Sequence, residues 1–196
     1  MKKRKPVEER KEEVFFAIAH IIAEKGLSEV STTEVAKRLG VSQPAIYKYF
    51  KNKDQMLVYF ISHIKQQLEN ILNKAQTGKN TIQKLKILYE HHFELIEKTK
   101  ILPRVIFSDE IHLGDPEKRK ALASVIDLYK EGIKSILQEG IKKGEIKKID
   151  VEIGANLIMG FIISCTLNWM LQGMNYSLRK KAQEVTSQLS ILLTPC

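Results

Sequence analysis

The chain of 196 residues is long enough for one large domain, or for a small domain beside a larger one. Its hydrophobic content of 43% is typical of a globular protein with a buried core, and its net charge of +9 favours an anionic partner such as nucleic acid or an anionic membrane surface. The two cysteines, Cys165 and Cys196, do not form a pair at metal-ligand spacing, and no apolar segment follows the charged start M-K-K-R-K-P. We therefore expect a reduced, cytoplasmic protein.

Helical periodicity runs through the whole sequence and strand-type alternation is scarce, so we expect an all-α fold of about nine helices. The fourth helix is expected to begin at Asn52 and to run to the break at 77–80. The other expected helices cover about 7–25, 31–40, 42–50, 81–98, 103–111, 116–143, 151–173 and 177–193.

Two of these helices are very short and directly adjacent. Ser31 or Thr32 is the expected cap of the first, where Ser31 and Glu34 have the spacing of a capping box, and Gly40 ends it. Ser42 is the expected cap of the second, and Ile46 and Phe50 are its buried positions. Two short helices joined by a tight glycine turn predict a helix-turn-helix unit, whose second helix enters the DNA major groove.

The remaining faces of that second helix carry residues with the chemistry of DNA contacts. The Gln43 amide is suited to adenine, the Lys48 ammonium to guanine and the Ala45 methyl to the thymine methyl. The backbone N–H groups after Asn52, together with Lys53, form a second phosphate site. The alternative is that the tyrosines are packing residues and the lysines a solvated surface. We expect 1–53 to be the DNA-binding domain and 54–196 to be a second, larger helical domain.

Residues 8–54 resemble the DNA-binding domain of the TetR family of bacterial transcriptional regulators. The resemblance is carried by T-T-E-V-A-K-R-L-G-V-S at 32–42 and P-A-I-Y-K-Y-F-K-N-K at 44–53. It implies a homodimeric, ligand-responsive regulator, most often a repressor, that binds an inverted repeat in double-stranded operator DNA. It implies too that 54–196 are the effector-binding and dimerisation domain. It also implies base contacts from Gln43, Pro44, Ala45 and Lys48, and phosphate contacts from Thr33, Ser42, Tyr47, Tyr49 and Lys53.

No charged residue occurs from Ile153 to Leu178, a length that would span a membrane. Small and polar residues recur there every four positions, which favours a buried or interface helix instead. The alternatives are a stripe that packs inside one chain and a stripe at a two-fold axis, and the resemblance favours the second. The expected interface residues are Asn156, Gly160, Ser164, Val185, Leu189 and Leu192.

The resemblance also implies an effector pocket among the middle helices, suited to an acyl chain, an aromatic drug or a similar lipophile. Its candidate residues are Phe60, His63, His92, Phe93, Ile106, Phe107, Tyr129, Asn168 and Trp169. Family members similar to this C-terminal half respond to fatty acyl thioesters, which makes such a ligand one candidate. The alternative for each of these residues is that it is an ordinary core residue.

Signatures of an enzyme are missing from the sequence. Asp109 and His112 lie one helical turn apart, as metal ligands can, but H-E-x-x-H, P-loop and dinucleotide patterns do not occur. We expect neither catalysis, nor a cofactor, nor a metal. The alternative to a regulator is a helical structural or membrane-surface protein with a non-specific basic patch.

Overall fold

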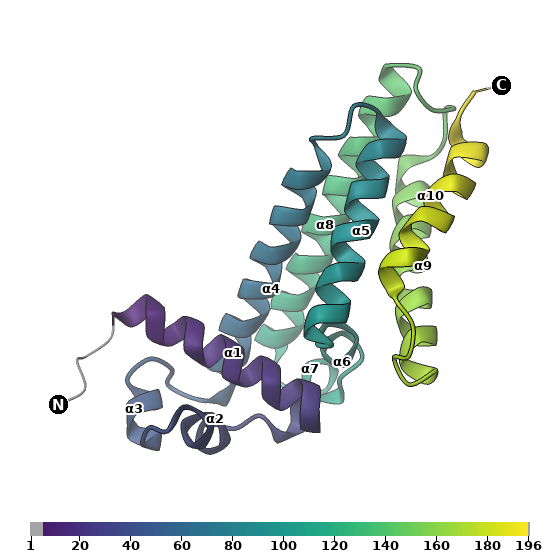
Figure 1. Cartoon of the computed structure of the whole chain (residues 1–196). Coiled ribbons are helices and arrows are strands. Elements are labelled where there is room, and N and C mark those ends of the chain that lie inside the picture. The colour runs from purple at the N-terminus through teal and green to yellow at the C-terminus, as the bar shows by residue number, and fades with distance from the viewer. Residues whose placement is uncertain (1–5, 196) are drawn as a thin grey trace. The chain divides into compact units, whose positions relative to one another are not determined.

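The computed structural model describes residues 6–195, in which ten α-helices and one short 3₁₀ helix form the fold and no strand occurs (Figure 1). The expected all-α class is confirmed. The basic segment M-K-K-R-K and Cys196 lie outside the described residues. The helices are α1 Val7–Lys25, the 3₁₀ helix Leu27–Glu29, α2 Thr32–Leu39, α3 Gln43–Tyr47, α4 Lys53–Ala75, α5 Thr81–Thr99, α6 Leu102–Ile106, α7 Asp109–His112, α8 Pro116–Lys142, α9 Val151–Leu171 and α10 Leu178–Leu193.

One helix more than expected arises because the predicted helix over 103–111 is divided into α6 and α7. Phe107 leaves helical geometry, and Ser108 is extended with φ −82° and ψ 129°. The Ser108 hydroxyl then accepts a hydrogen bond from the Glu110 backbone N–H at 3.2 Å and starts α7. Periodicity predicts one helix here because the apolar positions continue across the interruption.

The chain forms two compact units, and both α4 and α8 contribute to each of them. The first unit comprises residues 6–64 and Thr99–Ala123, and the second comprises Lys65–Lys98 and residues 124–195. The expected domain boundary after residue 53 stays a prediction, because a compact unit is not by itself an independently folding domain.

The first unit is built on the apolar stripe of α1, where Val14, Ile18 and Ile21 are completely buried. Gly26 ends this helix with φ +94°, a conformation that a side chain at Cβ would disfavour. The Arg104 side chain of α6 donates a hydrogen bond from Nη1 to the Ile22 carbonyl oxygen at 3.2 Å. The end of α1 is therefore held by apolar burial and by a polar contact with α6.

The second unit has its core along α5, where Leu85, Leu88 and Phe93 are fully buried. Tyr89 is buried beside them, and its hydroxyl donates to the Ile158 carbonyl oxygen of α9 at 3.4 Å. Helix α9 also packs against α10 (Figure 1). Only one side of α9 is thereby covered.

The uncovered side of α9 is unusually apolar. Leu157 and Leu171 are 69% and 78% exposed, and Ile153, Phe161, Ile163 and Leu167 are also exposed. Within the described residues, α9 is the one helix that is long and apolar enough to cross a membrane, although a core helix of a soluble protein meets the same description. The surface of a single chain therefore leaves a large apolar area in water, which indicates an interaction site.

Candidate nucleic-acid interface

Helices α2 and α3 meet at a turn whose geometry requires glycine. Gly40 adopts the left-handed conformation with φ 63° and ψ 36°, and the Val41 N–H donates to the Ala36 carbonyl oxygen at 3.0 Å. Below the turn, Ile46 is completely buried and Phe50 is 3% exposed, as their spacing predicts. Helix α3 ends at Tyr47 rather than near Phe50. Its anchoring residues fix which of its faces is open to solvent.

The open surface carries the residues that the sequence predicts as DNA contacts. Tyr47 is 49% exposed although it is aromatic, so it is not a packing residue of this chain. Thr33, Ser42, Pro44 and Lys48 are also exposed, whereas Gln43, Ala45, Tyr49 and Lys53 are partly buried. All nine therefore lie at or close to the surface of α2, α3 and the start of α4.

Thr32, which the sequence suggested only as an alternative helix cap, links two of these side chains. Its hydroxyl accepts a hydrogen bond from Gln43 Nε2 at 2.9 Å and donates to the Tyr47 hydroxyl at 3.4 Å, while Thr32 itself is buried. Thr32 is free to do so because Ser31 caps α2, accepting from the Glu34 N–H at 3.1 Å. The Thr-Thr pair at the first turn was the available signal, since consecutive helical positions face different directions.

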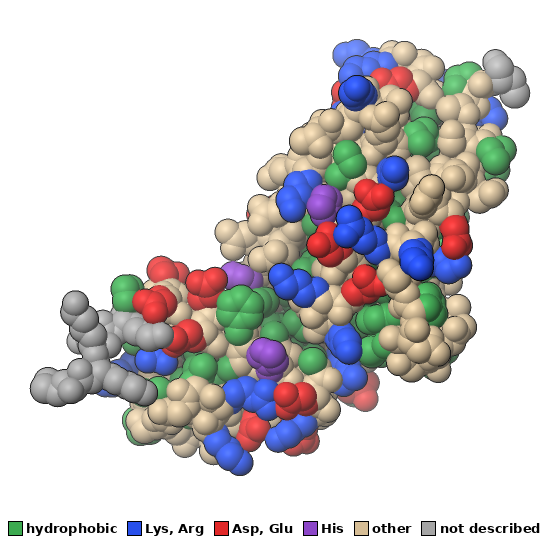
Figure 2. Space-filling model, in the orientation of Figure 1, with side chains coloured by type: hydrophobic (Ala, Val, Ile, Leu, Met, Phe, Trp, Pro, Cys, Tyr) green, Lys and Arg blue, Asp and Glu red, His purple; other side chains and the backbone are tan. Residues whose placement is uncertain are grey.

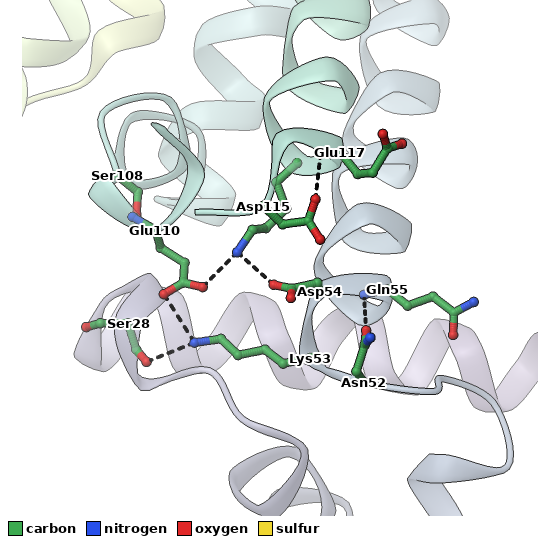
Figure 3. A network of polar contacts seen from close by, with 10 residues as sticks. Ser28, Asn52, Lys53, Asp54, Gln55, Ser108, Glu110, Asp115 and Glu117 are labelled. Atoms are coloured by element: carbon green, nitrogen blue, oxygen red, sulfur yellow. Dashed lines mark hydrogen bonds and ion pairs between the residues drawn. The ribbon is translucent and has the colours of Figure 1, made fainter. Parts of the chain in front are cut away.

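The start of α4 is capped as expected. The Gln55 N–H donates to Asn52 Oδ1 at 2.8 Å, and the Gln55 side chain accepts in return from the Lys51 N–H at 2.6 Å. Lys53 is the first residue of α4. Its ammonium group lies 3.4 Å from the Ser28 carbonyl oxygen and 3.3 Å from Glu110 Oε2 (Figure 3).

Acidic partners divide the basic residues of this region into two groups. Arg38 makes two hydrogen bonds to Glu24, at 3.0 and 2.5 Å, and Lys25 pairs with Glu34 at 2.9 Å. Within residues 6–195, no carboxylate lies at ion-pair distance from Lys48 or Lys51. Basic and acidic groups are also interspersed on the face drawn in Figure 2. The charges of Lys48 and Lys51, beside α3, are therefore free to contact phosphate.

The residues predicted for an effector pocket fall into both units. In the first unit, the aromatic rings of Phe60 and Phe15 stack at 5.0 Å, and the His63 ring lies 4.0 Å from Phe15. Burial lowers the pKa of His63. Ile106 is partly buried, and Phe107 is 57% exposed on the surface.

In the second unit, the structure brings His92 and Tyr129 together inside the core. His92 Nδ1 and the Tyr129 hydroxyl are 2.8 Å apart, and burial lowers the pKa of His92 to about 4 and raises that of Tyr129. The two neutral groups are thus joined by a hydrogen bond in apolar surroundings. Phe93, which follows His92 in the sequence, is fully buried. This is the clearest polar feature within the predicted pocket set.

The last two pocket candidates lie on α9. Trp169 is buried, and its indole N–H donates to the Tyr176 carbonyl oxygen at 2.7 Å, so its polar group is already satisfied. Asn168 is exposed and accepts from Gln172. A surface groove of about 440 Å³ between α4 and α5 is lined instead by residues such as Asn70 and His91. The pocket set stays a prediction.

The predicted dimer-interface residues are mostly accessible. Asn156, Gly160 and Ser164 are exposed on α9, and a Cβ added at Gly160 would meet nothing within 4 Å in the chain. Leu192 is 66% exposed and Leu189 is partly exposed, whereas Val185 is buried within the chain. The α9 stripe therefore does not pack inside a single chain. Among residues 6–195, no group of three or more His, Cys, Asp or Glu is arranged to hold a metal ion.

An all-helical chain with a helix-turn-helix that presents tyrosine and lysine to solvent is typical of a DNA-binding regulator. Residues 14–60 match the profile described as bacterial regulatory proteins, tetR family, and residues 54–192 match that of the YsiA-like protein, C-terminal region. The chain belongs to the TetR family of bacterial transcriptional regulators.

Individual relatives are similar over nearly the whole length. The fatty acid metabolism regulator protein of Bacillus subtilis (strain 168) is 28% identical over 180 residues, which covers 91% of each chain. The crystal structure of the transcriptional regulator FadR from Bacillus subtilis in complex with stearoyl-CoA has a TM-score of 0.80 at 26% identity, covering 91% of this chain and 97% of that one. The structure of the fatty acid degradation regulator FadR from Bacillus halodurans has the same TM-score and identity, covering 96% of each chain.

Proposed function

We propose that this protein is a homodimeric repressor that binds an inverted repeat in operator DNA and is released from it by a long-chain fatty acyl thioester. The observation that carries the DNA-binding part is the α2–α3 unit, whose buried Ile46 and Phe50 turn Tyr47 and Lys48 toward solvent. The family to which the chain belongs uses this unit for DNA. Two copies of α3 enter successive major grooves, so the operator has two similar half-sites.

The contacts divide into two kinds. Gln43, Pro44, Ala45 and Lys48 contact bases, and the Thr32 hydroxyl holds the Gln43 amide beside the groove-facing surface. Contacts to phosphates come from Thr33, Ser42, Tyr47, Tyr49 and Lys53, and they position the protein without reading sequence.

The exposed apolar side of α9 is the proposed dimer interface, with the end of α10 beside it. Its small and polar stripe at Asn156, Gly160 and Ser164 permits close approach of two helices, and Leu157 and Leu192 supply apolar area. Burial in a dimer also explains how so apolar a helix remains in a cytoplasmic protein.

The effector assignment is supported by the relative whose structure holds stearoyl-CoA and matches 91% of this chain. An acyl chain needs an apolar site, and the core around α5 and α8 supplies apolar and aromatic residues. Within this core, the His92–Tyr129 pair is the polar group that we propose contacts the thioester end of the ligand. The effector favours the conformation that fits the operator less well, and the population shift releases DNA.

Selection of duplexes from a random pool, followed by titration with stearoyl-CoA, tests this proposal. We expect an enriched inverted repeat, and a loss of affinity for it by about 5- to 150-fold in the presence of stearoyl-CoA, with no loss in free coenzyme A. A pool without an enriched sequence, together with binding that disappears as salt rises, would overturn the proposal that the protein is a sequence-specific regulator. If an inverted repeat is enriched but the protein stays bound to it in stearoyl-CoA, only the assignment of the effector would be overturned.

A further inference from the structure

A chain of four charged side chains connects the start of α4 with α7 and α8 in the first unit (Figure 3). Lys118 Nζ lies 2.7 Å from Asp54 Oδ1 and 2.9 Å from Glu110 Oε1. The second oxygen of Glu110, Oε2, lies 3.3 Å from Lys53 Nζ. One carboxylate is therefore shared between a lysine of α8 and the first residue of α4.

Glu110 is held in place from two sides. The Lys118 side chain is only 3% exposed, so it is a fixed, buried partner rather than a mobile surface lysine. The Glu110 backbone N–H is bound to the Ser108 hydroxyl at 3.2 Å. Partial burial raises the pKa of Glu110, but hydrogen bonds from Lys118 and the charges of Lys53 and Lys118 outweigh it and hold that pKa below its ordinary value. The carboxylate is thus ionised and directed at Lys53.

The contact with Lys53 is the weaker end of this chain. At 3.3 Å it is longer than the two contacts of Lys118, and the Lys53 side chain remains 30% exposed. A partly exposed ion pair contributes little, so another anion can replace it. Lys48 and Lys51, by contrast, have no carboxylate at ion-pair distance within residues 6–195.

We propose that Glu110 is an internal substitute for DNA phosphate: its carboxylate holds Lys53 in the DNA-free protein and gives the lysine up to a backbone phosphate when DNA binds. Glu110 therefore lowers affinity for every duplex equally and leaves sequence preference unchanged. The inference rests on the proposed role of Lys53 as a phosphate contact. Because Glu110 lies on α7, 57 positions from Lys53 by residue number, its effect on DNA comes from outside the helix-turn-helix motif.

The test measures binding to the selected operator and to a mixed-sequence duplex over a series of salt concentrations. Glu110→Gln is expected to tighten binding to both duplexes by about two- to fivefold, the range of an exposed ion pair. The slope of log affinity against log salt should become steeper by up to about 0.9, because one more lysine charge is available to phosphate. The ratio between the two duplexes should not change.

Three further variants isolate the cause. Glu117→Gln makes the same charge change at an exposed residue that pairs with Lys120 at 2.9 Å, and it should leave binding almost unchanged. Glu110→Asp keeps the net charge but withdraws the carboxylate by one methylene, so it should tighten binding in the same direction. In a Lys53→Ala background, Glu110→Gln should no longer tighten binding.

Each failure has a distinct meaning. Equal or weaker binding by a folded Glu110→Gln protein would overturn the proposal, as would a gain that persists without Lys53. If Glu117→Gln tightened DNA binding by the same factor, the effect would come from net charge, and this result would also overturn the proposal. If the wild-type protein bound neither duplex, the proposed function would fail together with this inference, whereas failure of the inference alone leaves wild-type binding intact.

Discussion

The buried His92 makes the stability of this protein depend on pH in a calculable way. Burial lowers the pKa of His92 from 6.5 to about 4. At about pH 8 the imidazole is neutral in both the folded and the unfolded chain, so it contributes no pH dependence there. At about pH 5 it is mostly protonated in the unfolded chain but still neutral in the folded one, and protons therefore stabilise the unfolded state.

The two pKa values give the size of the effect. Between pH 8 and pH 5, the free energy of unfolding should fall by about 2 kcal/mol through His92 alone, and by about 3 kcal/mol once the pH is below 4. The variant His92→Gln keeps an acceptor for the Tyr129 hydroxyl but does not titrate. Its free energy of unfolding should therefore fall by about 2 kcal/mol less than that of the wild type over the same interval.

Urea unfolding followed by circular dichroism, at pH 8 and pH 5 and at one protein concentration, measures this difference. Tyr129→Phe is the matched control, because it removes the 2.8 Å hydrogen bond but leaves the imidazole buried, so the pH dependence should remain. His63, whose pKa is also lowered by burial, contributes equally to all three proteins. Equal losses in wild type and His92→Gln, or an NMR titration of His92 with a pKa near 6.5, would refute the reasoning.

Three other substitutions have expected outcomes. Lys118→Met leaves the partly exposed Asp54 and Glu110 without their buried partner, so urea unfolding should show a loss of about 1 to 2 kcal/mol. Thr32→Val removes the hydroxyl that holds Gln43, so duplex selection should show relaxed preference at one base position while stability changes by less than about 1 kcal/mol. Leu157→Asp places a charge in the proposed α9 interface, so sedimentation should show monomer where the wild type is a dimer.

Each of these outcomes has a clear contrary. A loss below about 1 kcal/mol in Lys118→Met would mean that the two carboxylates are adequately solvated without the lysine. An unchanged duplex preference in Thr32→Val would show that Gln43 does not depend on this hydroxyl for its position. A Leu157→Asp protein that remains dimeric would place the interface elsewhere. Phe107→Asp, at another exposed apolar residue, is the control for a general effect of added surface charge.

Local sequence patterns were enough to predict most of the helices and the helix-turn-helix unit of this protein. Apolar spacing, the Ser31 and Asn52 caps and the glycine after α2 are local signals, because each acts within one or two helical turns. The same spacing placed Ile46 inward and left Tyr47 outward. The nine predicted DNA contacts needed only this local geometry together with the TetR-like motif.

Contacts between residues far apart in the chain became known only from the packing of the helices. Periodicity could not reveal that α6 and α7 are separate helices, since a single capping serine divides a continuous apolar pattern. It could not pair His92 with Tyr129, 37 residues later, because either residue alone is compatible with an ordinary core. Nor could it place Glu110 beside Lys53. Such pairs depend on how helices far apart in the chain pack together, and the residue pattern within one helix does not identify the helices that pack against it.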